Sequence, residues 1–207
     1  MKTTKTMTRT QLETLYRVMM KRIAKNFSAE KLSFLIGRKD DYVGLVEMLE
    51  ADPYSDDDLK CIAVALEEED VENLCPSVAD DTNVSVQMEI ELIADKCTYR
   101  CAVIDPERNL QPYFLLQEHS FESVILIENN EFDAVLANAA ITLQIKAGYF
   151  FESRLAVKIY QSINRFLGVT LSPTYIENAL NSFCTEDNDA CLQKQQNNEK
   201  RFVYIEA

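Results

Sequence analysis

The chain has 207 residues, of which 47% are hydrophobic and 27% are charged, and its formal net charge is −13. This composition excludes a largely disordered protein, because enough apolar side chains are present to form a sizeable core. No apolar run reaches the roughly 18–20 residues that span a bilayer, and the N-terminus lacks the apolar segment of a signal peptide. We therefore expect a cytoplasmic protein with no membrane partner.

The charge is distributed unevenly along the chain. Residues 1–39 contain ten Lys or Arg and two Glu, a net charge of +8, so residues 40–207 carry −21. A basic segment attached to an acidic body favours contact with nucleic acid through one end of the molecule. The alternative interpretation, in which the basic segment only keeps the chain in solution, stays open.

Residue types that often carry chemistry form no recognisable motif. The six cysteines lack the CxxC spacing of zinc and redox sites, and the four glycines form no phosphate-binding loop. His119 is the only histidine, and no nucleophile with an orienting partner can be identified beside it. We expect no catalytic residue, no metal and no cofactor, so the chain is predicted not to be an enzyme.

The first third of the chain has the periodicity of short helices. Apolar residues at spacings of three and four predict an amphipathic helix over residues 11–25. Ser28 is a candidate N-cap of a second short helix, and Gly37 can adopt the left-handed conformation of a sharp turn. Asp40 or Asp41 would cap a third helix, residue 55 would open a fourth, and a short fifth is expected near residues 71–74.

Five short helices within residues 10–75 resemble the Cro/C1-type helix-turn-helix domain of bacterial and phage repressors. The matching positions are Ser28-x-x-x-Leu32, Leu35-x-Gly37, Tyr42-Val43-x-x-Val46-Glu47 and Leu59-x-x-Ile62-Ala63-x-Ala65-Leu66. The resemblance implies that the second helix begins on the DNA backbone, at Ala29, and that the third reads base edges. The base-reading positions would be Asp40, Asp41, Gly44 and Leu45. The candidate backbone-contacting residues are Lys21, Arg22, Lys25, Ser28, Lys31, Arg38 and Lys39.

The middle of the chain changes to the periodicity of strands. Residues 76–83 are polar and are expected to form a linker. Apolar and polar residues alternate over 84–92 and again over 97–104, and short apolar runs follow at 113–116 and 124–127. This pattern predicts three or four antiparallel strands within residues 84–128.

The last third has the order of three helices followed by a β-hairpin. Helices are expected from residue 132 to Gly148, from Ser153 to Gly168 and from Ser172-Pro173 onward, and strands are expected over 191–195 and 201–206. This order resembles a winged-helix unit. The resemblance implies DNA contacts by the third helix and the hairpin, through Thr174, Tyr175, Asn178, Lys194, Lys200 and Arg201. The alternative is a plain helical domain whose hairpin only covers its core.

The predicted fold class is α+β. It combines a five-helix repressor-like bundle over 1–75, a linker over 76–83 and an α+β domain over 84–207, with strands in 84–128 and a winged-helix-like unit in 131–207. The predicted function is a non-enzymatic transcriptional regulator that binds double-stranded DNA, with a second copy supplying further contacts. The rival hypothesis is a protein-interaction adaptor or antirepressor on a helix-turn-helix scaffold that has lost DNA binding.

Overall fold

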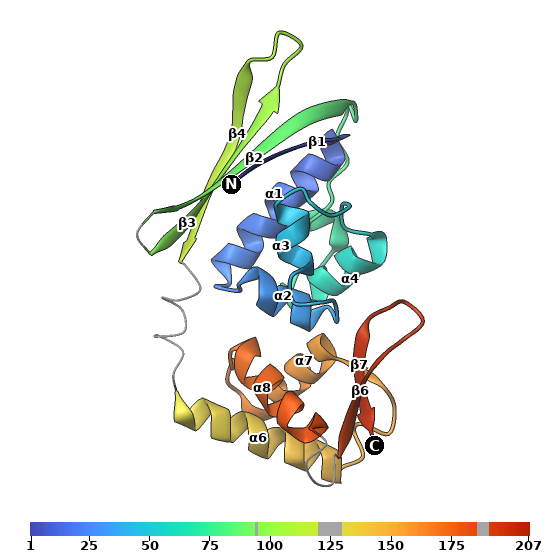
Figure 1. Cartoon of the computed structure of the whole chain (residues 1–207). Coiled ribbons are helices and arrows are strands. Elements are labelled where there is room, and N and C mark those ends of the chain that lie inside the picture. The colour runs from blue at the N-terminus through green and yellow to red at the C-terminus, as the bar shows by residue number, and fades with distance from the viewer. Residues whose placement is uncertain (94, 120–129, 186–190) are drawn as a thin grey trace. The chain divides into compact units, whose positions relative to one another are not determined.

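The computed structural model describes residues 1–93, 95–119, 130–185 and 191–207. The chain forms two compact units (Figure 1). Unit 1 consists of Met1–Leu32 and Asp41–Ile127, and unit 2 consists of Ser33–Asp40 and Glu128–Ala207. Ser33–Asp40 therefore belongs to unit 2 although its neighbours on both sides in the chain belong to unit 1.

Unit 1 contains a four-stranded antiparallel sheet in the order β1-β2-β3-β4. Its strands are β1 (Lys2–Thr8), β2 (Asn83–Ile93), β3 (Lys96–Ile104) and β4 (Leu110–His119). Met88 lies opposite Cys101 in the pairing of β2 with β3, and both side chains are buried. The first strand is thus paired with a strand that is about eighty residues later in the sequence, as the register of Lys2 with Glu89 shows.

The helices among the described residues of unit 1 are α1 (Arg9–Ala24), α2 (Ala29–Leu35, which crosses into unit 2), α3 (Tyr42–Glu47), α4 (Asp56–Ala65) and the 3-10 helix η1 (Val71–Asn73). Capping boxes fix two helix starts: Thr8 with Gln11 for α1 and Ser55 with Asp58 for α4. α1 packs against β1, β2 and β4, with the ring of Tyr16 5.2 Å from that of Phe114. The helices and the sheet therefore share one core.

The predicted five-helix bundle over residues 1–75 is wrong. The chain begins with strand β1, and the sheet that contains β1 is central to unit 1 rather than separate from the helices. Lys2–Thr8 consists mainly of threonine and lysine, and threonine favours strands while lysine suits a sheet edge. Apart from the end of α2, the helices of residues 9–74 belong to the same unit as the strands of residues 83–119, whereas the sequence predicts a linker between them at 76–83. The strand expected over residues 124–127 lies outside the described residues.

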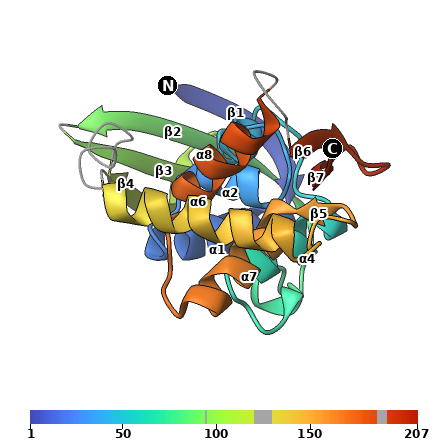
Figure 2. The same ribbon diagram turned by 90° about the horizontal axis from the view of Figure 1, so that it is seen from below.

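The described residues of unit 2 after Asn130 form three helices and a three-stranded antiparallel sheet. In chain order these are α6 (Glu131–Lys146), β5 (Arg154–Leu155), α7 (Ala156–Leu167), α8 (Pro173–Cys184), β6 (Leu192–Gln196) and β7 (Phe202–Glu206). The sheet order is β5-β7-β6. Gly168 ends α7 with φ of 69°, and Pro173 occupies the first turn of α8. Figure 2 shows α6 and α8 side by side, and their contacts form most of the helical packing in this unit.

Segment Ser33–Asp40 joins unit 2 through Gly37, which has φ of +71°. The carbonyl of Gly37 accepts a hydrogen bond of 2.7 Å from the amide of Phe202. A Cβ at position 37 would lie 2.7 Å from the Phe202 carbonyl, so only glycine fits this approach. Among the described helices, none combines the length and the apolar character needed to cross a membrane.

Candidate functional site

Two predicted DNA-contacting lysines, at the end of α1 and directly after it, are engaged with acids of unit 1. Lys21 Nζ lies 2.7 Å from an oxygen of Glu68, and Lys25 Nζ lies 2.5 Å from an oxygen of Glu67. These pairs engage two of the ten basic residues among the first 39. The acidic run at 67–70, which is distant in sequence, thus lies beside the basic face of α1 rather than apart from it.

Arg22 is fully buried and forms the centre of an ion-pair network. Its Nε and Nη2 donate to the two oxygens of Glu47 at 2.8 and 2.7 Å. Its Nη1 donates to Glu118 and to the carbonyl of Phe27, both at 2.6 Å. The hydroxyl of Tyr99 also donates to Glu118. Arg22 therefore connects α1, α3 and β4 inside unit 1, where a DNA phosphate cannot reach it.

The charge state of Arg22 follows from these partners. Burial disfavours the charged guanidinium, but the ion pairs with Glu47 and Glu118 outweigh it and raise the pKa of Arg22 above its usual range. Arg22 therefore stays charged within the core, and loss of its partners would leave that buried charge uncompensated.

The two other predicted DNA contacts in unit 1, Ser28 and Lys31, lie at the start of α2. Ser28 Oγ accepts a hydrogen bond of 3.3 Å from the amide of Lys31, as an N-cap at the start of α2 does. Lys31 is only 5% exposed. Lys31 is therefore not displayed toward solvent as the resemblance to a repressor domain implies, and Ser28 is half-buried.

In unit 2 the structure brings together basic residues that are about 160 positions apart. Arg38 Nη1 donates to the carbonyl of Glu199 at 3.3 Å, which places Arg38 beside the β6–β7 hairpin loop. Lys39 follows it and is exposed, and Lys200 is exposed within the loop, where it has φ of 57°. We name Arg38, Lys39 and Lys200 the hairpin cluster. All three residues are candidate DNA contacts by sequence, but no sequence pattern indicates that Arg38 and Lys39 belong to the same unit as Lys200.

The remaining hairpin residues differ in their accessibility. Lys194 is exposed, and its Nζ lies 4.9 Å from the ring centroid of Phe202, at the distance of a cation–π contact. Arg201 is fully buried, and its Nη1 donates to the carbonyl of Ile36 at 2.9 Å. Arg201 thus holds segment Ser33–Asp40 against the hairpin and is not available to a ligand.

Helix α8 presents a polar and uncharged face. Asn178 and Asn181 are exposed, and Thr174 is half-buried. The hydroxyl of Tyr175 accepts a hydrogen bond of 2.9 Å from the amide of Asn130, so this tyrosine connects α8 with the start of α6. The exposed face can donate and accept hydrogen bonds through side-chain amides.

One acid of α8 lies near the basic residues. Burial raises the pKa of Glu177, the charge of Asp40 raises it further, and Lys194 opposes both effects. Asp40, Glu177 and Lys194 are therefore electrostatic neighbours within unit 2. The acid weakens the positive potential that the hairpin would otherwise present.

The acidity of the chain is concentrated in unit 1. Unit 1 has 12 Lys or Arg and 23 Asp or Glu, a net charge of −11, whereas unit 2 has nine and eleven, a net charge of −2. A polyanion is repelled much less by unit 2 than by unit 1. The division of charge by fold differs from the division along the sequence, where the first 39 residues carry +8.

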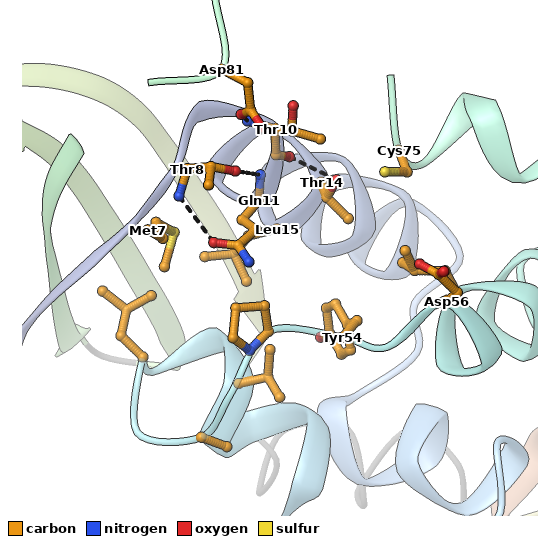
Figure 3. Close-up of a pocket in the computed structure, with 15 residues that line it drawn as sticks. Met7, Thr8, Thr10, Gln11, Thr14, Leu15, Tyr54, Asp56, Cys75 and Asp81 are labelled. Atoms are coloured by element: carbon orange, nitrogen blue, oxygen red, sulfur yellow. Dashed lines mark hydrogen bonds between the residues drawn. The ribbon is translucent and has the colours of Figure 1, made fainter. Parts of the chain in front are cut away.

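Unit 1 contains a cavity of about 320 Å³ between the start of α1 and the segment that leads into α4 (Figure 3). Met7, Leu15 and Leu59 supply apolar walls. The Gln11 side chain at its edge accepts a hydrogen bond of 2.9 Å from the Thr8 amide. The hydroxyl of Tyr54 is buried and has no hydrogen-bond partner among the described residues. No sequence pattern indicates this cavity, because its walls come from separate elements.

The cavity has the size of the smaller ligand pockets in proteins, which begin at roughly 300 Å³. Its walls can accept a small, largely apolar molecule, and its acids Asp56 and Asp81 disfavour an anionic one. It holds no arrangement of nucleophile and base that would perform chemistry.

His119 and the acids do not form a metal centre in the described part of the chain. His119 Nδ1 lies 3.7 Å from an oxygen of Asp95, and both side chains are more than half exposed. Within the described ranges, no three side chains of His, Cys, Asp or Glu come together as metal ligands. Comparison of the chain with protein-family models, with curated proteins and with solved structures finds no match in any of the three.

Proposed function

We propose that this chain is a non-enzymatic regulator that binds double-stranded DNA through unit 2. The observation that carries the proposal is the joining of the hairpin cluster, Arg38, Lys39 and Lys200, on a unit with three helices and a hairpin. The sheet order β5-β7-β6 supports the proposal, because it is similar to the strand arrangement expected of a winged helix. This proposal moves DNA contact away from α1, where the sequence suggests it.

In this proposal α8 enters the major groove and the hairpin lies along the backbone. Asparagine side chains can form paired hydrogen bonds with adenine edges, and Asn178 and Asn181 are the exposed amides of α8. The hairpin cluster and Lys194 would bind phosphates, which position a protein on DNA without specifying a sequence. Arg201, which is buried, has no direct role in this contact.

The test is a titration of labelled duplex DNA with the full chain, measured by fluorescence anisotropy at several salt concentrations. Four phosphate contacts predict a slope of log affinity against log salt of about −3.6. Lys39→Gln and Lys200→Gln should each reduce the steepness of this slope by about 0.9. Lys21→Gln and Lys25→Gln are matched controls, because they remove equal charge from unit 1, and they should leave the slope unchanged. Absence of binding to random and genomic duplexes at low salt would refute the proposal.

The second candidate function is a protein-interaction adaptor. The engagement of Lys21 and Lys25 with acids and the net charge of −11 on unit 1 favour it. An adaptor would show no salt-dependent affinity for duplex DNA, and Lys39→Gln would not change the anisotropy measured in the same titration. The two functions are therefore separated by one experiment.

A further inference from the structure

The solvent-facing side of α6 is apolar. Phe132, Val135 and Leu143 are 67%, 64% and 51% exposed, and Ala139 between them is also exposed. They recur at intervals of three and four residues, so they form one stripe along the helix, which we name the α6 stripe. The opposite side of α6 is buried through Ala137, Ala140 and Ile141.

This arrangement departs from the usual pattern of a surface helix, which buries its apolar face and exposes its polar one. Here both faces are apolar. Contiguous exposed apolar patches mark interaction surfaces on soluble proteins, whereas single exposed apolar residues need no explanation. Three large side chains within about three helical turns are such a patch.

We propose that the α6 stripe binds the α6 stripe of a second copy of this chain, with the two helices antiparallel and a two-fold axis at Ala139. Val135 would then lie opposite Leu143 of the second copy, because both are four residues from the axis. Phe132 and Lys146 are each seven residues from it. Ala139 at the axis is small, which permits the close approach of about 8–10 Å between packed helices.

The charges at the two ends of α6 fit this antiparallel arrangement. Glu131 and Asp133 lie in the first turn, and Lys146 lies in the last turn. An antiparallel pair places the acids of one copy beside the lysine of the other at both ends of the interface. A parallel pair would place acids beside acids. A two-fold interface of this kind is self-complementary and closes without forming a filament.

The size of the contact sets its strength. A helix of 16 residues is about 24 Å long, and one pair of such helices buries less than the roughly 800 Å² per partner of a standard interface. We therefore expect a reversible dimer that dissociates on dilution. The dimer does not depend on DNA binding, and it would bring two α8 helices into one assembly if DNA is bound.

The first test is sedimentation of the full chain over a wide micromolar concentration range. The wild-type chain should convert from monomer to dimer, and Val135→Glu should raise the dissociation constant at least about ten-fold, equivalent to about 1.4 kcal/mol. Asn138→Glu is the matched control, because Asn138 is exposed on the same helix but lies beside the stripe. It should leave the dissociation constant within about three-fold, by the same conversion. A chain that stays monomeric at every concentration overturns the proposal.

The second test identifies the occupant and its direction. Glu131→Lys alone should weaken the dimer, and the double variant Glu131→Lys with Lys146→Glu should restore it, because both charges are reversed at each end. A parallel pair would instead be strengthened by Glu131→Lys. Restoration supports the antiparallel second copy, and failure of restoration overturns it.

A disulfide provides an independent measurement of the axis. In a Cys191→Ser background, Ala139→Cys should form a covalent dimer under mild oxidation, because residues on the axis face each other. Asn138→Cys should remain monomeric on the same non-reducing gel. Circular dichroism confirms that these exposed substitutions leave the helices folded. Equal cross-linking of the two variants would contradict an axis at Ala139.

Discussion

Replacement of Arg22 by alanine distinguishes a structural role of this residue from the DNA contact that its sequence position suggests. Arg22→Ala removes five hydrogen bonds and leaves the carboxylates of Glu47 and Glu118 without their counter-ion. Glu47 is only 1% exposed, so water cannot replace the guanidinium. Breaking a buried pair in this manner costs about 3–5 kcal/mol in free energy of unfolding.

Lys21→Ala is the matched control. It removes an adjacent cation, but the Lys21 and Glu68 side chains are 27% and 17% exposed, and a pair that water reaches contributes about 0–1 kcal/mol. Urea unfolding followed by far-UV circular dichroism measures the difference. With a slope of about 2 kcal/mol per molar, Arg22→Ala should lower the midpoint by about 2 M, and Lys21→Ala by less than about 0.5 M.

Hydrogen exchange then locates the effect in the molecule. Peptides of α1 and α3 should lose protection in Arg22→Ala, because its partners connect these elements. The pair Arg22→Met and Glu47→Met should recover much of the stability, since apolar residues of similar volume replace buried ion pairs well. The reasoning would be refuted if Arg22→Ala unfolded within about 1 kcal/mol of the wild type.

Three further predictions concern other buried groups. Tyr54→Phe should leave the free energy of unfolding unchanged or raise it by up to about 1 kcal/mol, because the buried hydroxyl has no partner in the described structure. Thermal denaturation measures this, and a clearly lower melting temperature of the variant would contradict it. Glu177→Gln should stabilise the chain at neutral pH, because burial and then the charge of Asp40 raise the pKa of Glu177 in the folded state. The stability that protonation of Glu177 contributes is fully present below the pKa of the unfolded chain and is lost as pH rises through the pKa of the folded chain. Urea unfolding at a series of pH values should therefore show the variant's advantage disappearing in acid, and a constant advantage would be inconsistent with it. Iodoacetamide at pH 8 should alkylate exposed Cys191 well before Cys101, since burial raises the pKa of the Cys101 thiol to about 12; mass spectrometry of digests measures the order, and equal rates would exclude the burial of Cys101.

The elements that could be predicted from the sequence are those with local signals. Ser55 begins α4 as its capping pattern indicates, Pro173 lies in the first turn of α8, and Gly168 ends α7. Each signal acts within a few residues of the element that it defines. Gly37 likewise adopts the predicted left-handed turn.

The features that could not be predicted depend on partners far away in the chain. Strand β1 has little apolar periodicity of its own, and its pairing with β2 is what determines its conformation. Arg22 has the sequence context of a basic helix face, but its partners Glu47 and Glu118 follow it by 25 and 96 residues. A buried cation and a DNA-binding cation look the same until their neighbours are known.

The assignment of Ser33–Asp40 to unit 2 means that no single cut in the chain separates the two units. Cleavage after Ile127 leaves part of unit 2, including Gly37, in the N-terminal fragment, while its hydrogen-bonding partner Phe202 is in the C-terminal fragment. Unit 2 is therefore built from both fragments, and neither fragment alone contains all of its residues. Co-expressed fragments 1–127 and 128–207 should reassociate without a covalent link, as the halves of a split protein do.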